Sequence, residues 1–114
     1  MHVHNVTRNC PIGDRIDVAD TSAKRRTGLL QHPGLEPGQG LWIVPCEAIH
    51  MIGMKFPIDV IFLSKKKQVL KVRSAVKPGW HFSACLTAHS VLELPVGTIE
   101  GTGTEKGDQL QLVR

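Results

Sequence analysis

The sequence predicts a mainly β domain of the α+β class, built as a small antiparallel β-barrel or sandwich with one short helix near residues 21–31. Three observations support this prediction. Short apolar runs rich in branched residues recur along the chain, with turn signals roughly every 8–12 residues. Only one segment combines a helix-capping residue with a helix-forming composition. The 114 residues are also the size of one domain, so we expect residues 1–114 to form a single domain.

The first predicted elements are a strand and the helix. Residues 14–20 alternate between polar and apolar side chains, which is the two-residue period of a half-buried strand. Thr21 or Ser22 can then cap a short helix that runs to about Leu30. This helix is expected to end at Pro33-Gly34, because such a pair breaks helical structure.

The best hairpin candidate lies in the middle of the chain. Leu41–Val44 is too short for a helix and rich in β-forming residues, and Pro45 ends it. Ile58–Leu63 is a second apolar run. Residues 69–73 supply the return strand after a turn of three lysines, Lys65–Lys67.

Turn signals divide the last third of the sequence in the same way. Ser90–Leu94 is predicted as a further strand that ends at Pro95. Residues 97–104 are predicted as a loop or a weak helical turn, because glycines dilute the helical signal. Gly107-Asp108 then leads into a last strand at residues 109–113. Helices do not alternate with strands as they do in parallel α/β proteins.

Composition narrows the function classes. The net charge is +4 and the pI about 9.2, which is mildly basic and falls short of the dense lysine and arginine stripes of dedicated nucleic-acid binders. Positive charge gathers at Lys24–Arg26, at Lys65–Lys67 and along Lys71–Lys77. We interpret the lysine triplet as a solvated turn, with a phosphate-contacting patch as the alternative. A nucleic-acid partner is therefore not expected.

Cysteine usage and hydropathy predict a cytoplasmic protein. Cys10, Cys46 and Cys85 are an odd number of cysteines at wide spacing, as expected of free thiols in a reducing compartment. No run approaches the roughly 20 consecutive apolar residues of a membrane helix. The N-terminal residues Met1–Asn5 lack the charged and then apolar layout of a signal peptide. We therefore expect no membrane association.

Four sequence motifs together resemble a known family. They are Arg26-Thr27-Gly28-Leu29-Leu30, Gly53–Leu63, Val91–Gly97 and Gly107-Asp108, in this order. The chain resembles the domain of unknown function 192 family, also called uncharacterised protein family 0127, over about residues 14–114. The resemblance implies a compact, mainly β domain and no established activity. Where the commoner family pattern has a Trp-Met-Lys-Asn-Thr-like stretch, this chain has His50–Phe56, as in a subgroup that contains Cys and His.

A cysteine and a histidine four residues apart form the first candidate site. Thiolate and imidazole are zinc ligands, and the spacing of Cys46 and His50 places both on one face of a helical turn. Cys85, His81 and His89 can supply the other ligands of a zinc site if the strand that follows Trp80 lies beside this loop. The alternatives are a Cys–His catalytic pair, or a small buried cysteine beside a hydrogen-bonded loop histidine.

Two carboxylates interrupt otherwise apolar strands. Asp59 lies near the start of Ile58–Leu63, and Glu93 lies inside Ser90–Leu94. An unpaired buried charge costs several kcal/mol, so each carboxylate must face water, find a partner, or join a shared cleft that does acid–base chemistry. We interpret both as local structural groups that accept backbone N–H donors or pair with an arginine such as Arg26.

The side chains around Lys55 indicate a pocket wall. Met54 and Phe56 flank it with a period of two, so both can line an apolar surface while Lys55 points to the opposite face. On that face Lys55 would meet an anionic ligand or solvent. Packing in the core is the alternative for Met54 and Phe56.

These observations favour a small binding or accessory domain with its ligand site at the loop of residues 46–56. The predicted ligand-binding residues are Cys46, His50, Met54, Lys55, Asp59 and Glu93. One alternative is a metal- or Cys-dependent enzyme that uses Cys46, His50 and Asp59, and the zinc ligands would then be Cys46, His50 and Cys85. A second alternative is a weak nucleic-acid contact through the basic turns. No cofactor is expected, with zinc as the alternative, and the partner is a small molecule or a protein.

Overall fold

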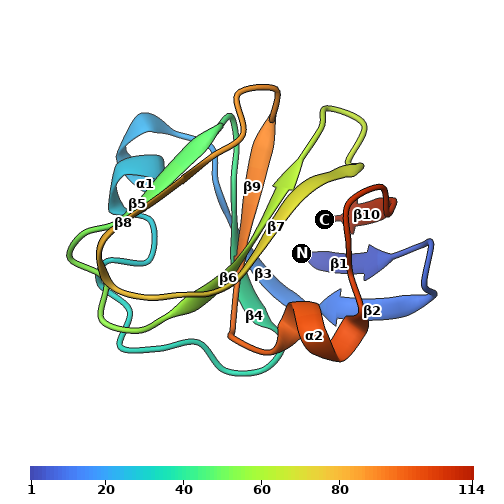
Figure 1. Ribbon diagram of the computed structural model, residues 1–114, viewed down its shortest axis with the longest axis horizontal. Helices are drawn as coiled ribbons and strands as arrows, with labels where there is room; N and C mark the ends of the chain where they lie inside the picture. The colour runs from blue at the N-terminus through green and yellow to red at the C-terminus, as the bar shows by residue number, and fades with distance from the viewer.

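Five strands form the central sheet of the computed structural model, which describes residues 1–114 (Figure 1). In spatial order they are β3 (Arg15–Ala19), β4 (Gln39–Ile43), β9 (Ser90–Leu94), β6 (Ile58–Leu63) and β7 (Val69–Val76). Apart from Asp59, β6 consists of apolar residues, and all of its side chains are buried. A strand that is covered on both faces has such a continuous apolar sequence.

The helix α1 (Ser22–Thr27) lies in the crossover between β3 and β4, the parallel pair of the sheet. Parallel strands need a long connection, because a tight turn reverses the chain. Thr21 caps the helix, since its side chain accepts a hydrogen bond from the backbone N–H of Lys24 at 3.2 Å. Gly28 ends the helix with a positive φ of 49°. The predicted helix near residues 21–31 is confirmed, and it is shorter than predicted because of this glycine.

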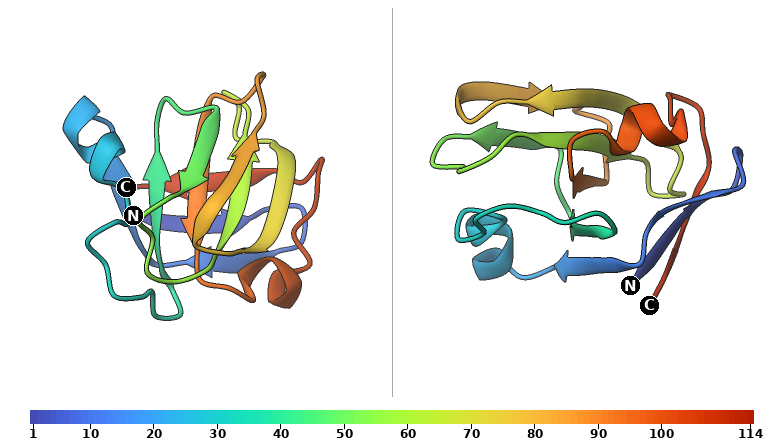
Figure 2. Two further views of the ribbon diagram at one scale, coloured as in Figure 1. Left: turned by 60° about the vertical axis from the view of Figure 1, so that its left-hand side comes forward. Right: turned by 90° about the horizontal axis from the view of Figure 1, so that it is seen from below.

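Two smaller sheets accompany the central one. The first contains β10 (Leu110–Val113), β1 (His2–Asn5) and β2 (Cys10–Gly13), in that order. Because β1 pairs with β10, the two chain ends lie side by side in all views (Figures 1 and 2). The second is a ribbon of two strands, β5 (Ala48–Met51) and β8 (Gly79–Ala84). A second helix, α2 (Thr98–Thr102), follows β9, and neither helix has the length and hydropathy needed to cross a bilayer.

The core has two apolar clusters, one on each face of the central sheet. Side chains alternate along β4, β6 and β9, so neighbouring residues point to opposite faces. The first cluster includes Ile16, Trp42, Ile61, Leu63, Leu92 and Leu94, with Val3, Ile12 and Leu110 of the terminal sheet. The second cluster includes Leu41, Ile43, Val60, Phe62 and Val91, with Leu29, Ile49 and Met51. The ribbon and the segment after α1 therefore cover this second face.

The structure confirms the mainly β, α+β class and corrects three details of the predicted fold. No sheet closes on itself, so the barrel alternative is wrong: β3 and β7 remain the open edges of the central sheet. β3 and β4 run parallel, whereas the sequence predicts an antiparallel arrangement. α2 is a second helix, of five residues, whereas the predicted fold has one; of the two alternatives for residues 97–104, the helical turn is the one that forms.

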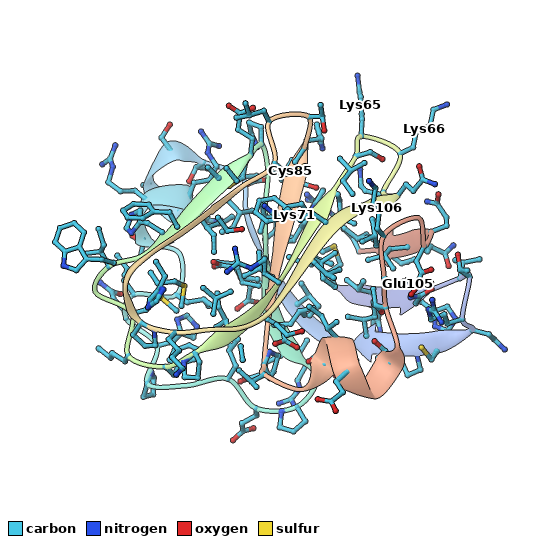
Figure 3. The ribbon with its side chains drawn as sticks, viewed as in Figure 1. Lys65, Lys66, Lys71, Cys85, Glu105 and Lys106 are labelled. Carbon is cyan, nitrogen blue, oxygen red and sulfur yellow. The ribbon has the colours of Figure 1, made fainter.

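The predicted central hairpin is confirmed as β6 and β7, with the lysines in its turn. Lys65 and Lys66 project from the tip (Figure 3). The ammonium group of Lys67 lies 5.3 Å from the centre of the Trp42 ring, which is a cation–π contact. α1, which carries the basic segment Lys24–Arg26, lies on the far side of the molecule from this turn (Figure 1). The two basic segments therefore do not form one continuous patch.

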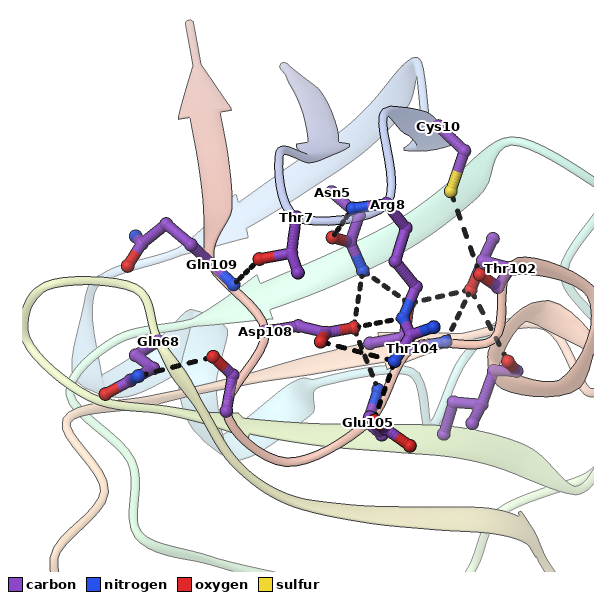
Figure 4. Close-up of polar contacts among 12 residues, drawn as sticks. Asn5, Thr7, Arg8, Cys10, Gln68, Thr102, Thr104, Glu105, Asp108 and Gln109 are labelled. Atoms are coloured by element: carbon purple, nitrogen blue, oxygen red, sulfur yellow. Dashed lines mark hydrogen bonds and ion pairs between the residues drawn. The ribbon is translucent and has the colours of Figure 1, made fainter.

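A polar network joins the C-terminal segment to the turn between β1 and β2 (Figure 4). Its centre is Asp108, which is 4% exposed. The carboxylate accepts hydrogen bonds from Asn5 Nδ2 at 3.0 Å, Arg8 Nε at 2.6 Å and the backbone N–H of Glu105 at 3.1 Å. Burial opposes ionisation of this carboxyl, but the hydrogen bonds from Arg8 and Asn5 outweigh it and lower the pKa of Asp108. The motif Gly107-Asp108 thus has a structural role.

We expect Asp108→Ala to lower the free energy of unfolding by about 2 kcal/mol, because it removes an acceptor from Asn5 and from the Glu105 N–H. This loss of stability is smaller than the loss caused by removing one partner of a fully buried ion pair. The reason is that Arg8 is 32% exposed and keeps its 2.8 Å contact with Glu105. Urea unfolding measures the difference. Asp14→Ala, at an exposed carboxylate, is the control and should change stability by less than about 0.5 kcal/mol. Equal effects of the two substitutions would contradict the role of Asp108.

Candidate functional site

A pocket of about 310 Å³ opens between α1, the loop after β4, β5 and the central sheet. From α1 and the segment after it, the lining residues are Arg25, Arg26, Thr27, Gly28, Leu29 and Leu30. From β4, the next loop and β5, they are Ile43, Pro45, Cys46, Ala48, Ile49 and His50. Met54, before β6, and Glu93, in β9, complete the wall. Segments that are far apart in the sequence therefore build one site.

Glu93 is the buried acid of this pocket. The strand register places it opposite Leu41 of β4 and Val60 of β6, on the apolar second face of the sheet. It is 5% exposed, and its carboxyl has no hydrogen-bond or ion-pair partner in the chain. Burial without such a partner raises the pKa of Glu93 from 4.5 to about 7. Because buried polar groups are nearly always hydrogen-bonded, a carboxyl that instead faces a pocket is available to a ligand.

The thiol of Cys46 lies at the same pocket. It donates a hydrogen bond to the carbonyl of Ala48 at 3.2 Å, and the backbone N–H of Cys46 donates to the carbonyl of His89 at 3.0 Å. Burial raises the pKa of Cys46 above its ordinary value, and the charge of Glu93 adds to this rise, whereas Arg25 opposes it. A nucleophilic cysteine needs a lowered pKa, so this environment does not activate the thiol.

His50 lies at the pocket but does not act on the thiol. The register of the ribbon pairs it with Phe82 of β8, and the two rings lie 6.5 Å apart at an angle of 52°. Its side chain is exposed. The hydrogen bond of the Cys46 thiol goes to a backbone carbonyl and not to this imidazole. The two residues therefore share a pocket without forming a hydrogen-bonded Cys–His pair.

Two arginines of α1 bring positive charge to the helix side of the pocket. Arg25 makes two long hydrogen bonds of 3.4 Å, to the carbonyl of Val44 and the hydroxyl of Ser22. Arg26 is exposed and has no hydrogen bond or ion pair within the chain. Neither arginine forms an ion pair with Glu93, although all three residues line the same pocket.

The pocket brings together Cys46, His50, Met54 and Glu93 of the predicted ligand-binding residues. Lys55 is exposed and does not line it. Asp59 points to the other face of the sheet, because it precedes Val60, the residue that pairs with Glu93. Phe56 packs against the second core cluster, as the core alternative for this residue predicts.

The predicted zinc ligands do not form a cluster. No group of three or more His, Cys, Asp or Glu side chains lies close enough together to hold a metal ion. Cys85 does not line the pocket, and its sulfur lies 3.7 Å from the hydroxyl of Thr87. Cys46 and His50 line the pocket without this third ligand.

Sequence reasoning missed the helix side of the pocket. Arg25, Leu30 and Ile43 line it, and none of them was among the predicted site residues. The available signal was the motif that starts at Arg26. In the structure this motif ends α1 at Gly28, buries Leu29 in the second core cluster and lines the pocket along its whole length.

Comparison with known proteins agrees with the resemblance in the motifs. The model of the DUF192 family, described as "Uncharacterized ACR", matches residues 5–112. A UPF0127 protein of Pyrococcus furiosus is 32% identical over 113 residues, which cover 94% of each chain. A UPF0127 protein of Thermococcus sibiricus is 34% identical over 101 residues, 84% of this chain. The match spans only 64% of the length of that second relative.

Two solved structures share the fold. A protein of unknown function from Novosphingobium aromaticivorans superposes with a TM-score of 0.84 at 21% identity, covering 97% of this chain and 82% of that one. A Sinorhizobium meliloti protein, described as a candidate transcription regulator, has a TM-score of 0.83 at 20% identity and covers 96% of this chain and 89% of its own. At these identities the similarity establishes the fold alone.

Proposed function

The chain belongs to the DUF192 family of uncharacterised proteins, and from this premise we propose that it is a small-molecule binding domain whose ligand occupies the pocket between α1 and β5. The names of the relatives state no ligand and no activity. Support for a binding function therefore comes from the residues of the pocket.

The Glu93 carboxyl is the main support for this function. An acid in the middle of an apolar sheet face costs stability unless it is paired, and an apolar residue of similar volume would avoid that cost. Nothing within the chain pairs with Glu93. A ligand that donates a hydrogen bond or carries a cation would satisfy the carboxyl, and the pocket gives it access.

The size and the walls of the pocket also fit a small ligand. Leu29, Leu30, Ile43 and Ile49 provide apolar surface, and a few polar groups stand among them. This composition is typical of small-molecule sites, whose volumes are about 300–1,000 Å³. The pocket, at about 310 Å³, belongs to the small end of this range.

Binding is favoured over Cys-dependent catalysis. The enzyme alternative needs Cys46, His50 and Asp59 at one place with a reactive thiolate. In the structure Asp59 lies on the other face of the sheet, and burial raises the pKa of Cys46. The pocket therefore provides an anchoring carboxyl without an activated nucleophile beside it.

We expect a fragment library, screened by ligand-observed NMR, to contain binders whose binding is lost in Ala48→Phe. The new ring would obstruct the pocket, because Ala48 is an exposed residue of its lining. Ala84→Phe is the matched control, since Ala84 lies directly opposite Ala48 on β8 and is outside the pocket. Fragments should bind this control as they bind the wild type. If no fragment binds the wild type, or if Ala48→Phe leaves binding unchanged, the pocket is not the ligand site.

A further inference from the structure

We infer that the ligand of this pocket is a small zwitterion with an apolar body, of the class of the apolar α-amino acids. Its ammonium group would bind the carboxylate of Glu93, and its carboxylate would bind the guanidinium groups of Arg26 and Arg25. This inference rests on the proposed binding function and deepens it by specifying the chemistry of the ligand.

The charges of the pocket form two separate poles. The acidic pole is Glu93, buried in the sheet wall, and the basic pole is on α1, where Arg25 is half-buried and Arg26 is exposed. Cys46, Glu93, Arg25 and Arg26 all line this one pocket. The two poles therefore face one common space.

The poles are not paired with each other. Opposite charges within about 4 Å form an ion pair, and none joins Glu93 to Arg25 or Arg26. Arg26 has no partner at all, and the hydrogen bonds of Arg25 are long. A ligand that carries both charges would form ion pairs with Glu93 and with the arginines at the same time.

A ligand with a single charge fits this arrangement less well. A simple amine would pair with Glu93 but would meet the positive charge of the two arginines. A simple carboxylate would pair with the arginines, whose planar forks suit it, but would lie near Glu93. In a zwitterion the ammonium group can face Glu93 while the carboxylate faces the arginines.

The walls and the volume specify the rest of the ligand. Leu30, Ile43 and Met54 provide apolar surface, and apart from the two poles only His50 adds a titratable base to the lining. A body without further charge is therefore expected. The volume of about 310 Å³ suits a molecule of amino-acid size, since larger ligands occupy the upper part of the usual range.

The test compares matched sets of three ligands. Leucine, isoleucine, valine, methionine and phenylalanine are each titrated beside the amine that lacks the carboxylate and the acid that lacks the amino group. Isothermal calorimetry or ligand-observed NMR at millimolar concentration measures the affinities. We expect at least one amino acid to bind about tenfold more tightly than both of its single-charge analogues.

A substitution that removes one of the charged groups should remove the gain in affinity that comes from the ligand charge it binds. Glu93→Gln is expected to reduce the affinity for the amino acid to that of its acid analogue. Arg26→Gln is expected to reduce it toward that of the amine analogue, with Arg25 keeping part of the effect. Lys24→Gln removes one charge from the same helix at a residue outside this pocket, so all three affinities should stay unchanged.

The outcomes separate this inference from the proposed function. Amino acids that bind no better than their analogues, or that fail to bind while fragments do, would overturn the zwitterion and leave the binding pocket standing. If Lys24→Gln and Arg26→Gln lowered the affinity for the amino acid equally, the preference would result from the overall charge of α1. The contacts assigned to Arg25 and Arg26 would then be wrong. If neither fragments nor amino acids bind, both proposals fail.

Discussion

Glu93→Gln is expected to stabilise the protein by about 3 kcal/mol above pH 7 and to leave its stability nearly unchanged below pH 4.5. Glutamine has the shape of the protonated acid and does not ionise. Folding moves the carboxyl of Glu93 from water, where its pKa is 4.5, into the sheet wall, where its pKa is about 7. Between these values the folded protein keeps a proton that the unfolded chain has lost, so stability falls as the pH rises. Above pH 7 both states are ionised, and the full penalty remains.

Urea unfolding of the wild type and the variant over this pH range tests the prediction. Histidines also titrate there, but they are present in both proteins and cancel in the difference. Glu100→Gln is the control, because Glu100 is exposed on α2, and it should change stability by about 0.5 kcal/mol or less at every pH. A difference between wild type and Glu93→Gln that does not vary with pH would show that Glu93 does not titrate in this window.

Asp59→Ala is expected to lower the free energy of unfolding by about 4 kcal/mol. Asp59 is 1% exposed, and its two carboxylate oxygens accept the backbone N–H groups of Ala75 and Ile99, each at 2.9 Å. The first bond holds β7 next to an irregularity in its pairing with β6, and the second holds the start of α2. Alanine would remove two hydrogen bonds to a charged acceptor, each worth about 1.5–3 kcal/mol, and would leave the buried N–H of Ile99 without an acceptor.

Two further variants make this prediction specific. Asp59→Asn keeps one acceptor oxygen and turns an amide donor toward the other N–H group, so we expect about half of the loss, or about 2 kcal/mol. Asp17→Ala, at an exposed residue of β3, should change stability by less than about 0.5 kcal/mol. Equilibrium urea unfolding measures all three proteins. A loss of under about 1 kcal/mol in Asp59→Ala would contradict the structural role of this residue.

The two strand carboxylates have different roles although their sequence contexts are alike. Asp59 is fully satisfied by the backbone and stabilises the fold, whereas Glu93 is unsatisfied and destabilises it above pH 7. A group that costs stability and faces a pocket is typical of a functional site, where stability and function compete. The gain predicted for Glu93→Gln and the loss predicted for its ligand affinity are thus two results of one property.

The strands that the sequence predicts are those with a clear local pattern of apolar residues. Ile58–Leu63 and Ser90–Leu94 were predicted with the bounds that the structure shows, because each is a short apolar run between breakers. β1, β2 and β5 were not predicted. They are short and contain polar residues, Pro11 or glycine, and they are held by pairing with strands that are far away in the sequence.

The candidate site residues also divide into those that the sequence places correctly and those that it does not. The local sequence context predicts four ligand-binding residues that the structure places around one space: Cys46, His50, Met54 and Glu93. The same context predicts Asp59 as a ligand-binding residue, but Asp59 lies outside the pocket. The difference is one residue of register, because Val60 pairs with Glu93 and Asp59 therefore faces the other side of β6. Residue types and their alternation are local properties of the chain, whereas the face that each strand turns toward a neighbour depends on long-range pairing.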